Sequence, residues 1–77
     1  HILVVPREHI ESVPHLQPQH EGLVGRMVLR ARAIAEEEGL ASRGYRLVVN
    51  NGPEGGQVVP HLHMHLIGGR RLKDQIG

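Results

Sequence analysis

The order of apolar and polar positions along the chain predicts three strands and one long helix. The first strand is His1-Ile-Leu-Val-Val5, an aliphatic and β-branched run that ends at Pro6 and is typical of a buried strand. Residues 6–18 hold three prolines and predict a loop with a short turn at residues 7–10. Because a strand occupies the very first residues, we expect further sequence to precede them in the whole protein.

The second predicted element is the long helix, over residues 19–38. Its apolar residues follow two neighbouring stripes, one with Leu23, Met27 and Ile34 and the other with Val24, Val28, Ala31 and Ala35. Together they make an apolar arc that is wider than one sheet contact requires. Two interpretations stay open: a deeply buried core helix, and a helix that packs on its own sheet and on a second subunit. Gly39 predicts the helix end.

The remaining apolar segments predict a hairpin. Residues 45–50 form the second strand, residues 51–56 a turn-rich loop, and residues 57–67 the third strand, which Gly68-Gly69 ends. Because the connection is short, we expect the last two strands to pair antiparallel. The order strand, helix, strand, strand predicts the α+β class: a mostly antiparallel sheet with one long helix packed on it. Residues 1–77 then form a single domain that lacks its N-terminal strands.

Composition narrows the possible partners. The 77 residues carry a formal charge of +1, which gives no strong attraction to nucleic acid or anionic membrane, and only Arg70, Arg71 and Lys73 gather basic charge locally. No apolar run approaches the roughly 20 residues of a membrane span. The absence of cysteine excludes disulfides and thiolate metal sites and fits a reducing compartment, so we expect a cytoplasmic protein.

The seven histidines are the first sign of chemistry, and three of them alternate along the third predicted strand. Side chains on a strand change face at every residue, so His61, His63 and His65 should share one face, and Leu62, Met64 and Leu66 the other, under the helix. A neutral imidazole can attack phosphorus and hold it covalently, while neighbouring imidazoles receive phosphate charge.

Two alternatives compete with this interpretation. Alternating histidines are good zinc ligands, but no Asp or Glu stands beside the triplet and the chain has no cysteine, so we predict neither a metal nor another cofactor. A fortuitous polar face or a tag-like stretch is the other alternative, although a tag would not alternate with Leu and Met.

The loop before the triplet suits a phosphate group. Glycine lets backbone N–H groups approach an anion closely, so Gly55-Gly56 is a plausible phosphate cradle, and Asn50 and Gln57 flank it with amide donors.

Several motifs resemble the histidine-triad superfamily. The stretch "HLHMHL" resembles its His-x-His-x-His-x-x signature, "HILVVPREHI" its strand and loop before the long helix, and "GYRLVVNNGPEGGQ" its phosphate-side hairpin. The ending "HLHMHLIGGR" is similar to the Hint branch, which hydrolyses nucleoside phosphoramidates. The resemblance runs from His1 to about Arg71 and implies that this chain is the C-terminal part of such a domain.

The resemblance implies a role for each histidine. His63, the middle member, is the nucleophile that forms a nucleotidyl-histidine intermediate, and water then resolves it. His65 contacts the phosphate oxygens, His61 supports and orients the nucleophile, and His1, from the strand before the helix, completes the network.

The resemblance also places substrate-binding residues. Asn50, Gly56 and Gln57 match the loop positions near the phosphate. Val58 stands where the family often has Ser or Thr, so it offers only its backbone N–H there, which puts the leaving-group preference in doubt. Leu3 lines what this chain holds of the base pocket.

The implied function is hydrolysis of purine nucleoside 5′-phosphoramidates or related nucleotide conjugates, with an AMP-like product, by a homodimer joined through the long helix and the strand after it. Within the family, the alternatives are a dinucleoside polyphosphate hydrolase and a nucleotidyltransferase. Outside it, they are a nucleotide-binding module with little turnover and a zinc-binding protein. Neither nucleic acid nor a membrane is an expected partner.

Overall fold

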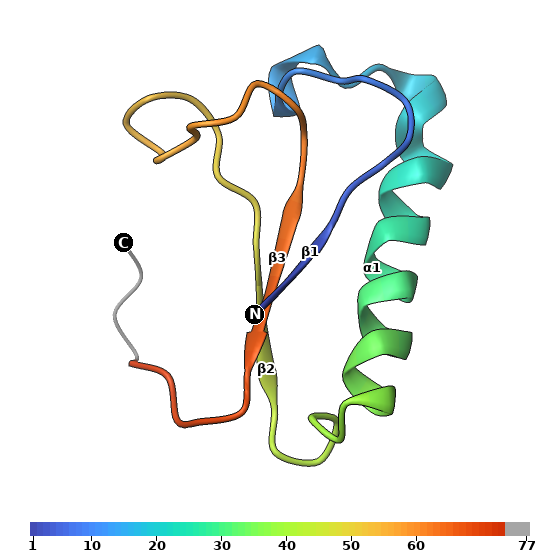
Figure 1. Cartoon of the computed structure of the whole chain (residues 1–77). Helices are drawn as coiled ribbons and strands as arrows, with labels where there is room; N and C mark the ends of the chain where they lie inside the picture. The colour runs from blue at the N-terminus through green and yellow to red at the C-terminus, as the bar shows by residue number, and fades with distance from the viewer. Residues whose placement is uncertain (74–77) are drawn as a thin grey trace.

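The computed structural model describes residues 1–73 and has the expected α+β architecture (Figure 1). Its regular elements are β1 (Ile2–Val4), α1 (Glu21–Glu37), β2 (Tyr45–Val48) and β3 (Met64–Gly68), with 3₁₀ turns at Val13–His15 and Pro18–His20. The strands form one antiparallel sheet in the order β1-β3-β2, so β3 is central. Within this part of the chain, no helix has both the length and the apolar character of a membrane span.

All four predicted ranges differ from the observed ones, and two of the differences have a clear structural cause. The helix begins at Glu21 rather than at residue 19, because Pro18–His20 forms a tighter 3₁₀ turn. The third strand spans only Met64–Gly68, and residues 57–63 lie outside it. Pro60 has no N–H to give to a sheet, and the N–H of Leu62 donates instead to the Ile10 carbonyl oxygen at 2.6 Å. The connection between β2 and β3 is therefore much longer than a tight hairpin turn.

The helix ends as the glycine predicts. Gly39 adopts a φ of +72°, and its N–H donates to the Glu36 carbonyl oxygen at 3.1 Å. The N–H of Leu40 donates to the Ala35 carbonyl oxygen at 2.8 Å, which completes the two reversed hydrogen bonds of a Schellman motif. This turn redirects the chain from α1 toward β2, so the helix and the sheet pack against each other.

The core lies between α1 and one face of the sheet. As predicted, the alternate residues Leu62, Met64 and Leu66 are buried, with exposed fractions of 4%, 6% and 1%. Met64 and Leu62 belong to the same apolar cluster as Met27 and Ala31 of the helix. The small side chain of Ala31 lets the helix approach the sheet closely, and the exposed fraction of this residue is zero. The other face of β3 therefore points away from α1.

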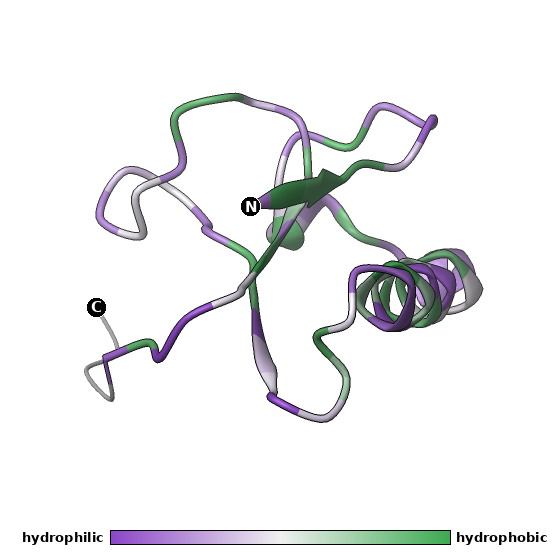
Figure 2. Cartoon of the chain, turned by 60° about the horizontal axis from the view of Figure 1, so that its bottom comes forward, coloured by the Kyte–Doolittle hydropathy of each residue, from purple (hydrophilic) through white to green (hydrophobic). Residues whose placement is uncertain are grey.

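β1 is only half buried, which corrects the prediction of a fully buried strand. Val4 is 8% exposed and packs in the core, whereas Leu3 and Val5 are 54% and 49% exposed on the opposite face. Figure 2 shows that this strand is apolar along its length. Its alternation therefore places an apolar surface on the sheet face that does not contact the helix.

Candidate active site

The sheet face that points away from α1 carries the candidate site. In the register of the sheet, Leu3 of β1 and Val48 of β2 both lie opposite His65 of β3. Residues directly opposite each other on paired strands share a face, so these three side chains stand in one row. Residues 61 and 63 keep the same alternation although they precede β3, and all three histidines of the triplet are half-buried. The alternation of half-buried histidines with buried Leu62 and Met64 is thus kept without a continuous strand.

His63 is held by a hydrogen bond that fixes its tautomer. Its Nδ1 lies 2.7 Å from the carbonyl oxygen of His61. A carbonyl oxygen only accepts hydrogen bonds, so Nδ1 carries the proton and donates. In the neutral ring, Nε2 then bears the lone pair, and this nitrogen has no hydrogen bond within residues 1–73. The ring of His63 is thus oriented with one nitrogen available to an incoming electrophile.

His1 and His65 form a pair across two strands. The Nε2 of His1 lies 2.8 Å from the Nδ1 of His65, and their ring centroids are 5.0 Å apart. The ring of His65 also meets that of His63 edge-on, with centroids 5.1 Å apart. When His1 donates to Nδ1, neutral His65 carries its proton on Nε2 and has a donor for an anion beside His63. The structure therefore brings His1, His63 and His65 into one row of imidazoles.

The ring of His61 lies apart from that row. Its Nε2–H donates to the Pro6 carbonyl oxygen at 3.1 Å, and its ring meets the ring of His9 edge-on at a centroid distance of 4.9 Å. It is the backbone carbonyl of His61, and not its side chain, that contacts the ring of His63. In this structure His61 therefore orients the ring of His63 through its backbone and not through its imidazole.

His9 is a neighbour of the triplet that the sequence interpretation missed. It sits in the loop after β1, and only the path of that loop brings it against His61. No regular spacing links the two positions in the sequence. The one available signal is that His9 follows the strand that begins with His1.

The predicted phosphate loop is closed by its own hydrogen bonds. The N–H of Gly56 donates to the Pro53 carbonyl oxygen at 3.1 Å, and the Nδ2 of Asn50 donates to the Gly55 carbonyl oxygen at 2.8 Å. Gly56 needs its glycine because φ is +81°. A Cβ on Gly55 would lie 2.1 Å from the carbonyl oxygen of Asn51, so no side chain fits there. Both glycines are thus required by the turn itself.

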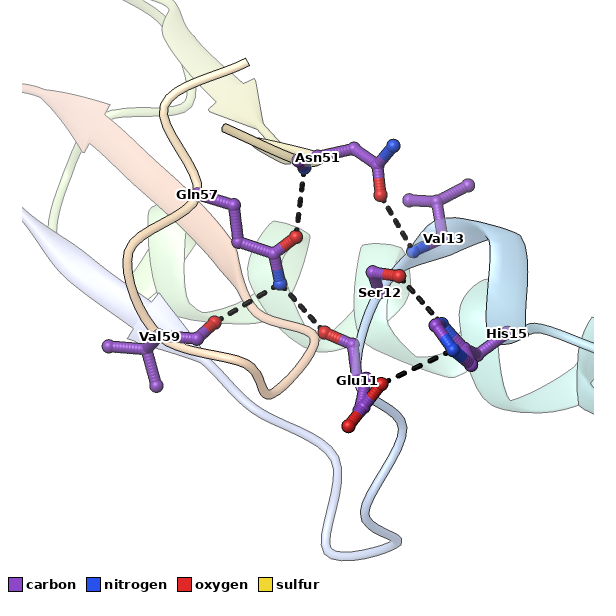
Figure 3. A network of polar contacts seen from close by, with 8 residues as sticks. Glu11, Ser12, Val13, His15, Asn51, Gln57 and Val59 are labelled. Atoms are coloured by element: carbon purple, nitrogen blue, oxygen red, sulfur yellow. Dashed lines mark hydrogen bonds and ion pairs between the residues drawn. The ribbon is translucent and has the colours of Figure 1, made fainter. Parts of the chain in front are cut away.

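Gln57 fastens this loop to the segment before the first 3₁₀ turn (Figure 3). Its Oε1 accepts from the N–H of Gly52 at 3.0 Å, and its Nε2 donates to the carbonyl oxygens of Glu11 and Val59 at 2.7 and 3.1 Å. The Oδ1 of Asn51 accepts from the N–H of Val13 at 3.2 Å and adds a second fastening. In this arrangement, both ends of the Gln57 amide bond protein atoms.

Val58 follows directly and is the most exposed apolar residue of the loop, at 89%. Its backbone N–H donates no hydrogen bond within the described residues, so it is available to an external acceptor. Val58 and Gln57 also line a cavity of about 200 Å³ together with Glu11, Ser12, Gly52, Pro53 and Pro60. The loop therefore offers an N–H donor at the edge of an open cavity.

The zinc alternative receives no support from the geometry. Among residues 1–73, no three His, Cys, Asp or Glu side chains are grouped so that they could hold a metal ion.

Comparison with known proteins agrees with this geometry. The HIT domain family matches residues 1–72. The chain is 50% identical over 72 residues to the purine nucleoside phosphoramidase of Escherichia coli (strain K12), covering 94% of this chain and 60% of that protein. It is 42% identical over 74 residues to adenylylsulfatase HINT1 of Arabidopsis thaliana, covering 94% of this chain and 50% of that protein.

Solved structures give the same result. The crystal structure of a HIT family hydrolase from Legionella pneumophila Philadelphia 1 matches with a TM-score of 0.95 and 39% identity, over 97% of this chain and 67% of that one. The chain thus spans 60% of the length of the Escherichia coli relative. The family match over nearly the whole chain and the row of imidazoles agree, and the chain belongs to the histidine-triad (HIT) family.

Proposed function

We propose that this chain carries the nucleophile of a hydrolase that cleaves purine nucleoside 5′-phosphoramidates or related nucleotide conjugates. The observation that carries the proposal is the hydrogen bond from His63 Nδ1 to the His61 carbonyl oxygen at 2.7 Å, which leaves Nε2 unprotonated. Two relatives are named as a purine nucleoside phosphoramidase and an adenylylsulfatase, and these names describe cleavage of a nucleotide from an amine and from sulfate. Both support a reaction at a nucleotide phosphorus.

The proposed reaction has two displacements. In the first, the lone pair of His63 Nε2 forms a bond to phosphorus, the bond from phosphorus to the amine breaks, and the amine leaves with a proton from a neighbouring donor. In the second, water attacks the phosphorus and returns a proton to that donor, the bond to Nε2 breaks, and the nucleoside monophosphate leaves. His65, which faces His1, and the Val58 N–H would donate to the phosphate oxygens.

Asn50, Gly56 and Gln57 support the site indirectly in this proposal. Their hydrogen bonds shape the loop that presents the Val58 N–H. Leu3 lies opposite His65 and is 54% exposed, so it offers an apolar contact for the purine base on the correct face.

A trapping experiment tests the proposed intermediate. The full chain is mixed with adenosine 5′-phosphoramidate, quenched within milliseconds, and analysed by mass spectrometry after digestion. We expect AMP release and a nucleotidyl adduct on the peptide that contains residue 63. Release of AMP without any adduct would contradict the covalent mechanism, and binding of AMP without turnover would favour the alternative of a binding module.

We also propose that the protein is a homodimer. Val28 is 41% exposed on α1, and among residues 1–73 the strand β2 lies at an edge of the sheet and pairs only with β3. An exposed apolar residue and an unpaired strand edge both suit a contact with a second copy. Light scattering at micromolar concentration is expected to give twice the chain mass for the wild type and a single chain mass for Val28→Glu.

Arg30→Glu is the matched control for the dimer, because it places the same carboxylate about 200° around the helix from Val28. We expect this control to remain dimeric. A monomeric wild type, or dissociation of both variants alike, would show that this face of α1 makes no specific contact.

A further inference from the structure

Four arginines from two distant segments line a single groove at the end of the sheet. Arg43 and Arg46 lie at the start of β2, and Arg70 and Arg71 follow the end of β3. With Gly44, Tyr45 and Leu72 they line a groove of about 280 Å³. In Figure 1 both segments lie at the lower end of the sheet, and in Figure 2 the segment after β3 is strongly hydrophilic. The antiparallel pairing of Tyr45 with Gly68 brings them together.

The lining of the groove is basic, and the charges of Arg43 and Arg70 have no counter-ion among the described residues. None of its lining residues is acidic. The guanidinium groups of Arg43 and Arg70 make neither an ion pair nor a hydrogen bond in the described part of the chain, whereas that of Arg46 donates to the Lys73 carbonyl oxygen at 2.5 Å. Between residues 39 and 73, Glu54 is the one acidic residue. Like charges held close together repel each other, so an anion in the groove would lower the free energy of this arrangement.

We propose that this groove binds a diphosphate group, either free or as part of a larger ligand. Guanidinium groups are planar forks of N–H donors that match pairs of phosphate oxygens. A groove of about 280 Å³ is large enough to admit a group of the size of pyrophosphate. The guanidinium groups of Arg43, Arg46 and Arg70 supply enough positive charge for two linked phosphates.

This groove is separate from the histidine site. The histidine row lies at the beginning of β3 and the groove at its end, and β3 rises by about 10 Å from His65 to Gly68. The groove therefore serves a second ligand, and its occupancy does not depend on the reaction proposed for His63.

Calorimetric titration with inorganic pyrophosphate at low salt tests the proposal on the full chain. The wild type is expected to bind pyrophosphate more tightly than orthophosphate, with an affinity that falls as salt is added. The double variant Arg43→Gln/Arg70→Gln is expected to weaken pyrophosphate binding by about tenfold or more, because two charge-assisted contacts are lost. The matched control is Arg7→Gln/Arg32→Gln, which removes the same charge outside the groove and should change the affinity less than about twofold.

Two further measurements separate this site from its alternatives. Amide chemical-shift changes on adding pyrophosphate should fall on residues 43–46 and 68–73, and shifts confined to the histidine row would contradict the proposal. A short DNA duplex should bind no more tightly than pyrophosphate; tighter binding of DNA would reassign the groove to nucleic acid. An equal loss of pyrophosphate affinity in both double variants would reduce the effect to net charge and overturn the proposal.

Discussion

Replacement of His63 by alanine is expected to reduce hydrolysis of adenosine 5′-phosphoramidate by at least about 1,000-fold while the protein stays folded. The proposed covalent bond forms at His63 Nε2, and alanine offers no nitrogen at that position. The fold should tolerate the change, since His63 is half-buried and loses one hydrogen bond, worth about 1 kcal/mol. Steady-state kinetics and urea denaturation of the same samples measure the two effects.

Two other histidine variants make this experiment specific. His15→Ala removes an imidazole that is 56% exposed and paired with Glu11, and its turnover should stay within about twofold of the wild type. His61→Ala should cost less activity than His63→Ala, because any residue at position 61 keeps the carbonyl that orients the nucleophile. Turnover by His63→Ala at the wild-type rate would rule out His63 as the nucleophile.

Substitution of Gly55 by alanine is expected to destabilise the protein by about 1–3 kcal/mol and to lower kcat/KM by about tenfold. The added Cβ would lie 2.1 Å from the Asn51 carbonyl oxygen, so the backbone of the loop must move. Gly55 also accepts the hydrogen bond from Asn50, and its displacement would shift the Val58 N–H that follows. Urea denaturation gives the change in unfolding free energy, and initial rates give kcat/KM.

Glu54→Ala is the control in the same loop. Glu54 is exposed and takes part in no hydrogen bond or ion pair with residues 1–73, so its loss should change stability by less than about 0.5 kcal/mol. If the two loop variants proved equally stable and equally active, the tight turn would have no part in holding the site.

The alternation of the histidines was predictable, whereas the extent of their strand was not. Leu62 and Met64 must enter the core under the helix, so the residues between and after them face the other way. The prediction of alternating faces requires only that the chain be locally extended, and not that it form a regular strand. The strand starts late because residues 61–62 pair with the loop after β1, as the bond from Leu62 to Ile10 shows. The path of that loop is a tertiary feature, and it also brings His9 to His61.

The hydrogen-bond partners of the polar residues in the loop also could not be predicted from the sequence. An amide such as Gln57 offers the same donors to a phosphate as to a backbone carbonyl. In the structure these donors bond Glu11 and Val59, and nothing in the local sequence favours one partner over the other. The phosphate-binding roles of Asn50, Gly56 and Gln57 stay predictions that the Gly55 variant probes indirectly.

The clustering of the arginines in the groove could not be predicted from the sequence either. The sequence reveals Arg70 and Arg71 as neighbours, but their approach to Arg43 and Arg46 depends on strand register. A net charge of +1 conceals a chain whose positive charge gathers at one end of the sheet.

The hydrogen bond between His1 and His65 joins residues 64 positions apart in the chain. Closing so long a segment is slow compared with forming a helix such as α1, because a contact between distant residues is gained only after much chain entropy is lost. During refolding, helical circular dichroism should therefore recover before β1 docks beside β3. The imidazole row would then be assembled late, and any activity that needs it would lag behind the helix signal.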